Sequence, residues 1–122
     1  MIKERPSLPN LINSGTNEIE IFQNKTLRPI IKMQHQLLIA SFQDYLLKRK
    51  IEFSVLSKEE KYVRIQSVFT RDISYKSLLL GYIIGHFEIE EYQFYTKDSS
   101  EMNKRIMKII QQRIQDSISE LT

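Results

Sequence analysis

The chain has no cysteine, and it has only three glycines and three prolines in 122 residues. Without cysteine it can form no disulfide, no thiolate metal site and no cysteine nucleophile. This absence also fits a reducing compartment, so we expect a cytoplasmic protein. Glycine and proline form most tight turns, and their scarcity favours helices over a strand-rich sandwich or barrel.

Long hydrophobic runs are also missing. The longest uncharged and mainly apolar stretch covers residues 77–87, whereas a membrane-spanning helix needs about 20 apolar residues. Residues 1–6 lack the apolar segment of a signal peptide. We therefore expect no membrane association.

The excess of positive charge is small, with 18 basic against 15 acidic residues. Acidic residues alternate with most of the basic ones, as in the Glu101–Arg105 pair, which is typical of a solvated helix face. Binding of a nucleic acid would require a basic stripe on one surface. We therefore rank it as an alternative that depends on whether two basic groups share a surface: Lys48, Arg49 and Lys50 in the first group, and Lys97, Lys104, Arg105, Lys108 and Arg113 in the second.

Apolar residues recur at helical spacing through most of the chain, which predicts an all-α, compact bundle of about five helices. We expect residues 1–15 to form an irregular N-terminal arm and residues 16–122 a single helical domain. Ser57 and Glu60 form a capping box, Asp72 and Asp98 are further helix caps, and residues 51–56 are an apolar connector in which a short extended piece is possible.

The first helix, which should begin near Thr16 or Asn17, meets a proline at position 29. Two interpretations are open: two helices joined near Thr26, or one long helix to about Arg49 that bends at Pro29. We favour the bent helix because the apolar residues keep roughly one phase across the proline. This phase predicts a buried stripe of Ile19, Phe22, Ile30, Met33, Leu37 and Ala40, which Leu27, Ile31 and Leu38 widen.

Residues 77–87 hold no charged side chain in a protein of which 27% is charged. A helix that is apolar on nearly every side is expected to be wrapped by other helices, so we predict a buried central helix here. Gly81 and Gly85 lie on one face of it, where another backbone or a ligand can approach closely.

Candidate site residues lie near the end of this run. His86 and Glu90 are one turn apart, so they are candidate metal ligands, although a site needs further ligands and a second shell. Tyr82, His86 and Tyr92 are candidates for a small-molecule or cofactor pocket. The sequence has no phosphate-binding glycine loop and no nucleophile elbow, so we assign no catalytic residue and no cofactor.

Three segments of the chain resemble one family: residues 22–32, 85–92 and 102–107. They are similar to a family of short bacterial proteins of unknown function, to which automated naming sometimes attaches the word "glyoxalase". The resemblance implies a helical fold and transfers no active site. Enzymes of the glyoxalase type use strands to present histidine and glutamate to a metal, whereas both histidines here, His35 and His86, fall in helical segments.

These observations favour a protein-interaction or homo-oligomeric module with an apolar patch near residues 75–95. A small-ligand or metal-dependent enzyme is one alternative, and it predicts a pocket in which Tyr82, His86 and Glu90 converge. A nucleic-acid-binding regulator is the other alternative.

Overall fold

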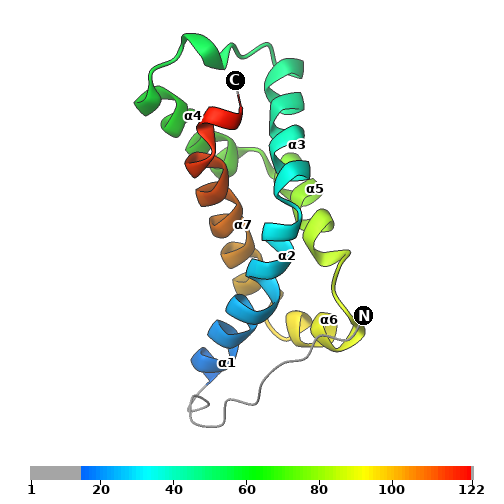
Figure 1. The fold of residues 1–122 in the computed structure, drawn as a ribbon. Helices are drawn as coiled ribbons and strands as arrows, with labels where there is room; N and C mark the ends of the chain where they lie inside the picture. The colour runs from blue at the N-terminus through cyan, green and yellow to red at the C-terminus, as the bar shows by residue number, and fades with distance from the viewer. Residues whose placement is uncertain (1–14, 122) are drawn as a thin grey trace.

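The computed structural model describes residues 15–121, and every regular element in that range is a helix (Figure 1). This confirms the predicted all-α fold. In chain order the elements are α1 (Gly15–Phe22), the π-helical turn η2 (Gln23–Leu27), α2 (Arg28–Met33), α3 (His35–Lys48), the 3-10 turn η3 (Phe53–Val55), α4 (Lys58–Arg71), α5 (Ile73–Ile84), α6 (Ile89–Thr96), α7 (Ser99–Asp116) and the 3-10 turn η4 (Ile118–Glu120). None of the helices in this part of the chain is long and apolar enough to cross a membrane. The predicted arm lies outside the described residues except for Gly15, which begins α1.

Elements α1 to α3 form the long bent helix that we favoured over two separate helices (Figure 1). Pro29 stands in the first turn of α2, directly after the π-helical turn η2. Proline has no N–H to donate, so the wider turn before it accommodates a position where a regular α-helical bond is missing. A second irregularity follows at Gln34, whose backbone (φ −93°, ψ 13°) departs from helical values.

The buried stripe of this long helix differs from the predicted one. Buried residues recur every four positions, at Phe22, Thr26 and Ile30 and then at Leu38, Phe42 and Leu46. Four residues of a regular α-helix exceed one full turn by about 40°, so a stripe with this spacing would wind around a straight helix. The π-helical turn and the irregularity at Gln34 interrupt the regular winding, and the predicted core positions Met33, Leu37 and Ala40 are exposed.

The prediction of a fully buried central helix needs the same kind of correction. In α5 only Tyr75, Leu79 and Ile83 are buried, and they form one stripe at positions i, i+4 and i+8. Leu78 on another side is 49% exposed, and Gly81 is exposed as well. An apolar sequence on all sides of a helix therefore does not mean that neighbours cover all of its sides.

Helix α7 forms the centre of the core. Its residues Met102, Ile106, Ile110 and Ile114 are at most 1% exposed, and α2, α3, α4, α5 and α6 all contact this helix. The connector before α4 contains the 3-10 turn η3 in place of an extended piece, and Phe53 of this turn is buried.

The predicted caps are confirmed. The Ser57 hydroxyl accepts from the Glu60 N–H and the Glu60 carboxylate accepts from the Ser57 N–H, which completes the capping box. Asp72 caps α5 by accepting from the Tyr75 N–H, and Asp98 caps α7.

Candidate functional site

The three residues predicted to converge in a pocket come from α5, the turn after it and α6. Tyr82 is half-buried on α5, whereas His86 is exposed just after α5 and contacts the side chain of Gln34. Glu90 is exposed on α6. The three cavities described for this structure are lined by other residues, and residues 15–121 contain no group of three side chains suited to hold a metal ion.

Helix α6 holds two further residues that bear on the site prediction. Tyr92, the other pocket candidate, is 48% exposed, with its ring against that of Tyr95. The buried acid of this helix is Glu91, one residue after Glu90. It accepts from the Glu88 N–H in a capping box and from the Thr26 hydroxyl at 3.4 Å, so this carboxylate joins the start of α6 to the turn η2.

The triplet Lys48, Arg49 and Lys50 ends α3. Lys50 has φ 57°, its N–H donates to the Leu47 carbonyl, and the Ile51 N–H donates to the Leu46 carbonyl. This pattern is the Schellman motif, in which the residue after the helix adopts a left-handed backbone. The triplet therefore closes α3 and places cations beside the carbonyl end of its dipole.

The basic residues of α7 lie elsewhere. All four line a groove between α7 and the segment η2–α2: Lys104, Arg105, Lys108 and Arg113. No residue of the triplet lines this groove. Arg49 lines a separate, smaller cavity together with Arg64 and Arg71. Arg49 thus lines a different hollow of the surface from the four basic residues of α7.

Helices α3 and α5 lie side by side and antiparallel. Gln34 contacts His86 at one end, the hydroxyls of Ser41 and Tyr75 are 2.9 Å apart in the middle, and the Tyr45 hydroxyl donates to Asp72 at the other end. Burial raises the pKa of Tyr75, so this phenol stays protonated and keeps its hydrogen bond.

The residues that flank this seam on its outer side form a mainly apolar surface, which we call the apolar face and which the Asp44–Lys48 ion pair borders. It consists of Met33, Leu37 and Ala40 from the long helix and Ser74, Leu78 and Gly81 from α5, all of them exposed. Met33 is 61% and Leu37 43% exposed. The spacing of each set, three or four residues, places it on one side of its helix.

Gly81 leaves open space at this face. Apart from its chain neighbours and the nearby backbone of α5, a Cβ on Gly81 would meet no atom of residues 15–121 within 4 Å. Internal packing therefore does not require a glycine here, although glycine in a helix interior costs about 0.5–1 kcal/mol relative to alanine. The open position lets another helix approach the backbone of α5 closely.

The end of α5 next to the apolar face is held by a compact polar cluster. Asp72 accepts from the Tyr75 N–H at 3.0 Å, from the Tyr45 hydroxyl at 2.7 Å and from Arg49 at 2.7 Å. The Tyr75 N–H, followed by the Tyr45 hydroxyl, lowers the pKa of Asp72 below its ordinary value. Burial, followed by the bond to Asp72, raises the pKa of Tyr45. The cluster fixes how α3 and α5 meet.

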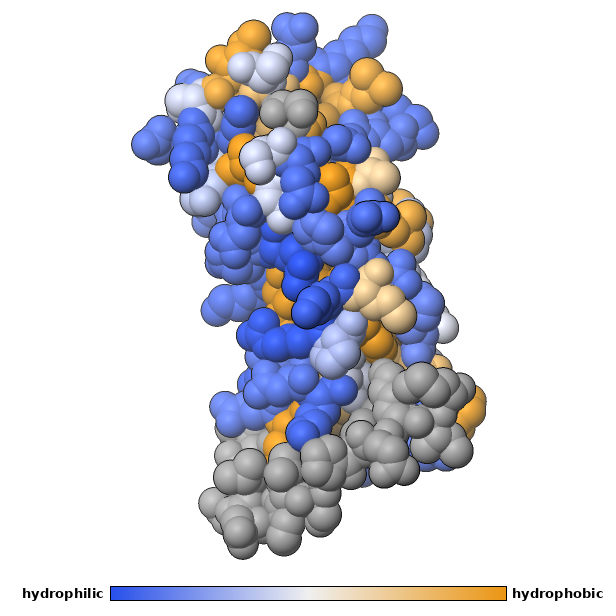
Figure 2. Space-filling model, viewed as in Figure 1, coloured by the Kyte–Doolittle hydropathy of each residue, from blue (hydrophilic) through white to orange (hydrophobic). Residues whose placement is uncertain are grey.

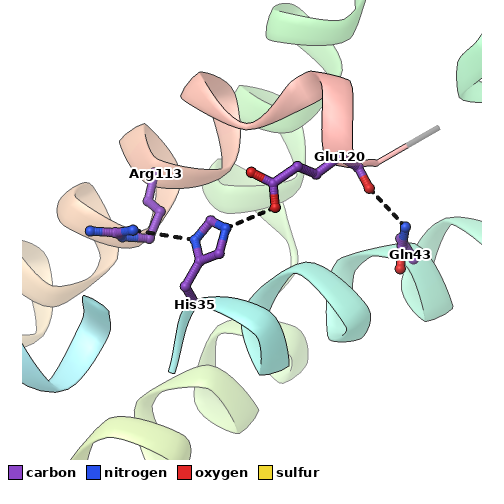
Figure 3. A network of polar contacts seen from close by, with 4 residues as sticks. All are labelled: His35, Gln43, Arg113 and Glu120. Carbon is purple, nitrogen blue, oxygen red and sulfur yellow. Dashed lines mark hydrogen bonds and ion pairs between the residues drawn. The ribbon is translucent and has the colours of Figure 1, made fainter. Parts of the chain in front are cut away.

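A second polar network joins α3 to the C-terminal end of the chain (Figure 3). Arg113 lies 3.2 Å from His35 Nδ1, His35 Nε2 lies 2.9 Å from a Glu120 carboxylate oxygen, and Gln43 donates to the Glu120 carbonyl. A guanidinium only donates, so Nδ1 is the acceptor and Nε2 holds the proton that points to Glu120. Sequence analysis missed this network because its members are up to 85 residues apart.

Comparison with protein-family models, with curated proteins and with solved structures finds no match to this chain. The resemblance to the family of short bacterial proteins therefore stays a prediction. The function has to be argued from the surfaces of the molecule.

Proposed function

We propose that this protein is a homo-oligomeric interaction module that pairs with a second copy of itself through the apolar face. One observation carries the proposal: the exposed, uncharged residues Ser74, Leu78 and Gly81 of α5 form a surface with the exposed apolar residues of the long helix. Exposed apolar surface of this kind marks interaction sites in soluble proteins.

A second copy of the same chain can cover the apolar face. In a symmetric dimer the same patch of both copies meets across the twofold axis, so the face that one copy leaves exposed is covered by the same face of the other. Two such pairs would pack as a four-helix arrangement, a common way to bury helix faces. Ala40 and Gly81 are small, so the backbones of the two copies can approach closely.

Sedimentation velocity over a range of protein concentrations tests this proposal. We expect the unchanged protein to sediment as a dimer, and Leu78→Asp to sediment as a monomer because a buried, unpaired carboxylate opposes association. Val63→Asp is the matched control, because Val63 is also an exposed apolar residue but lies on α4, outside the apolar face.

Circular dichroism shows whether each variant keeps its helices, so loss of the dimer can be separated from unfolding. A monomer at every concentration for the unchanged protein would contradict the proposal. So would an equal effect of Leu78→Asp and Val63→Asp, since that would place the contact elsewhere.

A further inference from the structure

The second surface with unusual chemistry is a groove of about 900 Å³ between the segment η2–α2 and helix α7. We call it the α2–α7 groove. Figure 2 shows mainly hydrophilic surface over the region where these helices run side by side in Figure 1. Its walls hold five cations and two acids: Arg28, Lys104, Arg105, Lys108 and Arg113, with Glu101 and Asp116. The groove thus has a formal excess of three positive charges, equal to the net charge of the whole chain.

Two of the arginines are held in place by other side chains. Arg105 donates from Nε to Glu101 at 2.8 Å and from Nη1 to Gln23 at 2.9 Å. Arg28 donates from Nε to Asn24 at 3.1 Å. Each guanidinium has five N–H donors in a fixed plane, so both keep donors for a further acceptor. Because the orientation of these two arginines is already set, they lose little side-chain entropy when an anion binds.

Arg113 lacks an acceptor for one of its donors. Its Nη1 reaches His35, while its Nε is buried and has no hydrogen-bond partner among the described residues. A buried donor without an acceptor is unfavourable. The guanidinium thus stays positively charged without an acidic partner of its own among these contacts, and an anion in the groove would bring negative charge close to it.

The lining also limits the kind of anion. Ile109 is the one aliphatic residue in the described wall of the groove, and no aromatic side chain is part of that wall. Stacking of nucleic-acid bases relies on aromatic side chains, and apolar ligands need an apolar lining. The volume suits a small ligand, and the charge excess suits one with several negative charges at short spacing.

We propose that the α2–α7 groove binds a linear chain of linked phosphates, which it recognises through the phosphate oxygens alone. Guanidinium groups match phosphate geometry with paired hydrogen bonds, and the lysines Lys104 and Lys108 add positive charge without directional demands. Neither the proposed dimer contact nor any residue of the apolar face takes part in this site.

Calorimetric titration with inorganic tripolyphosphate tests the proposal. We expect saturable binding that weakens as salt is added. Arg105→Gln should lower the affinity roughly tenfold or more, because it removes a charge-assisted and pre-oriented donor. Lys108→Gln changes an exposed side chain with less risk to folding and should lower the affinity several-fold. Lys48→Gln at the far end of α3 makes the same change in charge and should leave the affinity within about twofold.

Comparison ligands identify what is recognised. Adenosine triphosphate should bind about as well as tripolyphosphate and adenosine not at all, because the phosphates supply the contacts. No binding of tripolyphosphate, or an equal loss for Lys48→Gln and Lys108→Gln, would overturn the site. Polyglutamate binding as tightly as tripolyphosphate would overturn the preference for phosphate. A single-stranded oligonucleotide that tripolyphosphate cannot displace would overturn the proposal in favour of a nucleic acid.

Discussion

Helices α5 and α7 both contribute to the core, but their apolar residues are distributed differently around the helix. In α7 the apolar residues Met102, Ile106, Ile110 and Ile114 recur every four positions and are almost completely buried. The other sides of α7 are largely polar. In α5 apolar residues occur on every side, but only Tyr75, Leu79 and Ile83 are buried; Leu80, Tyr82 and Ile84 are partly buried against the core, and Ile73 and Leu78 are exposed.

The difference shows which part of the sequence the fold of one chain explains. The pattern of α7 matches its burial, so a single folded chain accounts for it. The pattern of α5 exceeds its burial: Leu78 and Gly81 are exposed on the side of the apolar face, and Ile73 is 73% exposed on another side. The proposed contact with a second copy would cover the part of this excess that lies in the apolar face.

The largest expected difference between α7 and α5 is in the loss of stability when one side chain of each helix is truncated to alanine. Ile106→Ala opens a cavity in a site that is 0% exposed, and we expect it to lower the free energy of unfolding by about 2–5 kcal/mol. Leu78→Ala should change it by about 0.5 kcal/mol or less, because solvent already reaches this side chain. Urea denaturation followed by circular dichroism measures both.

The measurement belongs at protein concentrations low enough for the monomer, because a dimer adds its association energy to the apparent stability. Val63→Ala on α4 is a control for an exposed apolar residue outside the apolar face. If Leu78→Ala cost as much as Ile106→Ala in the monomer, α5 would be more deeply packed than its exposure indicates, and the excess would disappear.

Gly81→Ala in α5 should have a smaller effect on the stability of the monomer, and in the stabilising direction. The added methyl group meets open space, and alanine is the better helix former by about 1 kcal/mol. We therefore expect the monomer to become more stable by about 0.5–1 kcal/mol, as measured by the midpoint of urea denaturation.

The same variant should weaken self-association, because the methyl group stands where the second copy approaches the backbone. Opposite signs for monomer stability and dimer affinity would show that Gly81 is adapted to the contact. A stabilised monomer with unchanged dimer affinity would show that the contact, if formed, lies away from Gly81.

The sequence predicted much of the fold because its signals are local. The caps at Ser57, Asp72 and Asp98 each depend on residues a few positions apart. The burial of the long helix was predicted only in part: Phe22 and Ile30 are buried, but extending one helical phase across Pro29 assumes a regular helix. The π-helical turn and the irregularity at Gln34 change this phase, and they exposed Met33 and Leu37.

The surfaces were less predictable than the fold. The apolar face joins two helices that are distant in sequence, and its existence depends on the same phase change. The α2–α7 groove places Arg28 opposite the basic residues of α7, and the bond from Arg105 to Gln23 spans 82 positions. No periodicity in one helix reports such a pairing. Arg28 directly precedes Pro29, and the sequence analysis interpreted this segment through the proline rather than through the charge.

The N-cap residues of α5 and α7 also differ, and replacing them gives the smallest expected effect on stability. Asp72 at the start of α5 accepts from a backbone N–H, a tyrosine and an arginine. Asp98 at the start of α7 accepts from the Glu101 N–H at 3.4 Å. The cap of α5 therefore has more to lose when its carboxylate is protonated.

This difference predicts a pH dependence. The contacts of Asp72, with the Tyr75 N–H first, lower its pKa in the folded protein below the ordinary value of 3.8. The stability that this carboxylate contributes is therefore fully present at pH values above 3.8 and is lost as the pH falls through the lowered pKa. Asn remains a good helix cap, so Asp72→Asn should destabilise the protein at neutral pH, and its deficit should shrink below about pH 4. Asp98→Asn is the matched change at α7 and should show a smaller deficit at neutral pH, because the Asp98 carboxylate accepts a single, long hydrogen bond. Urea denaturation from neutral to acid pH measures both, and a deficit for Asp72→Asn that stays constant across this range would contradict the role of the charge at the α5 cap.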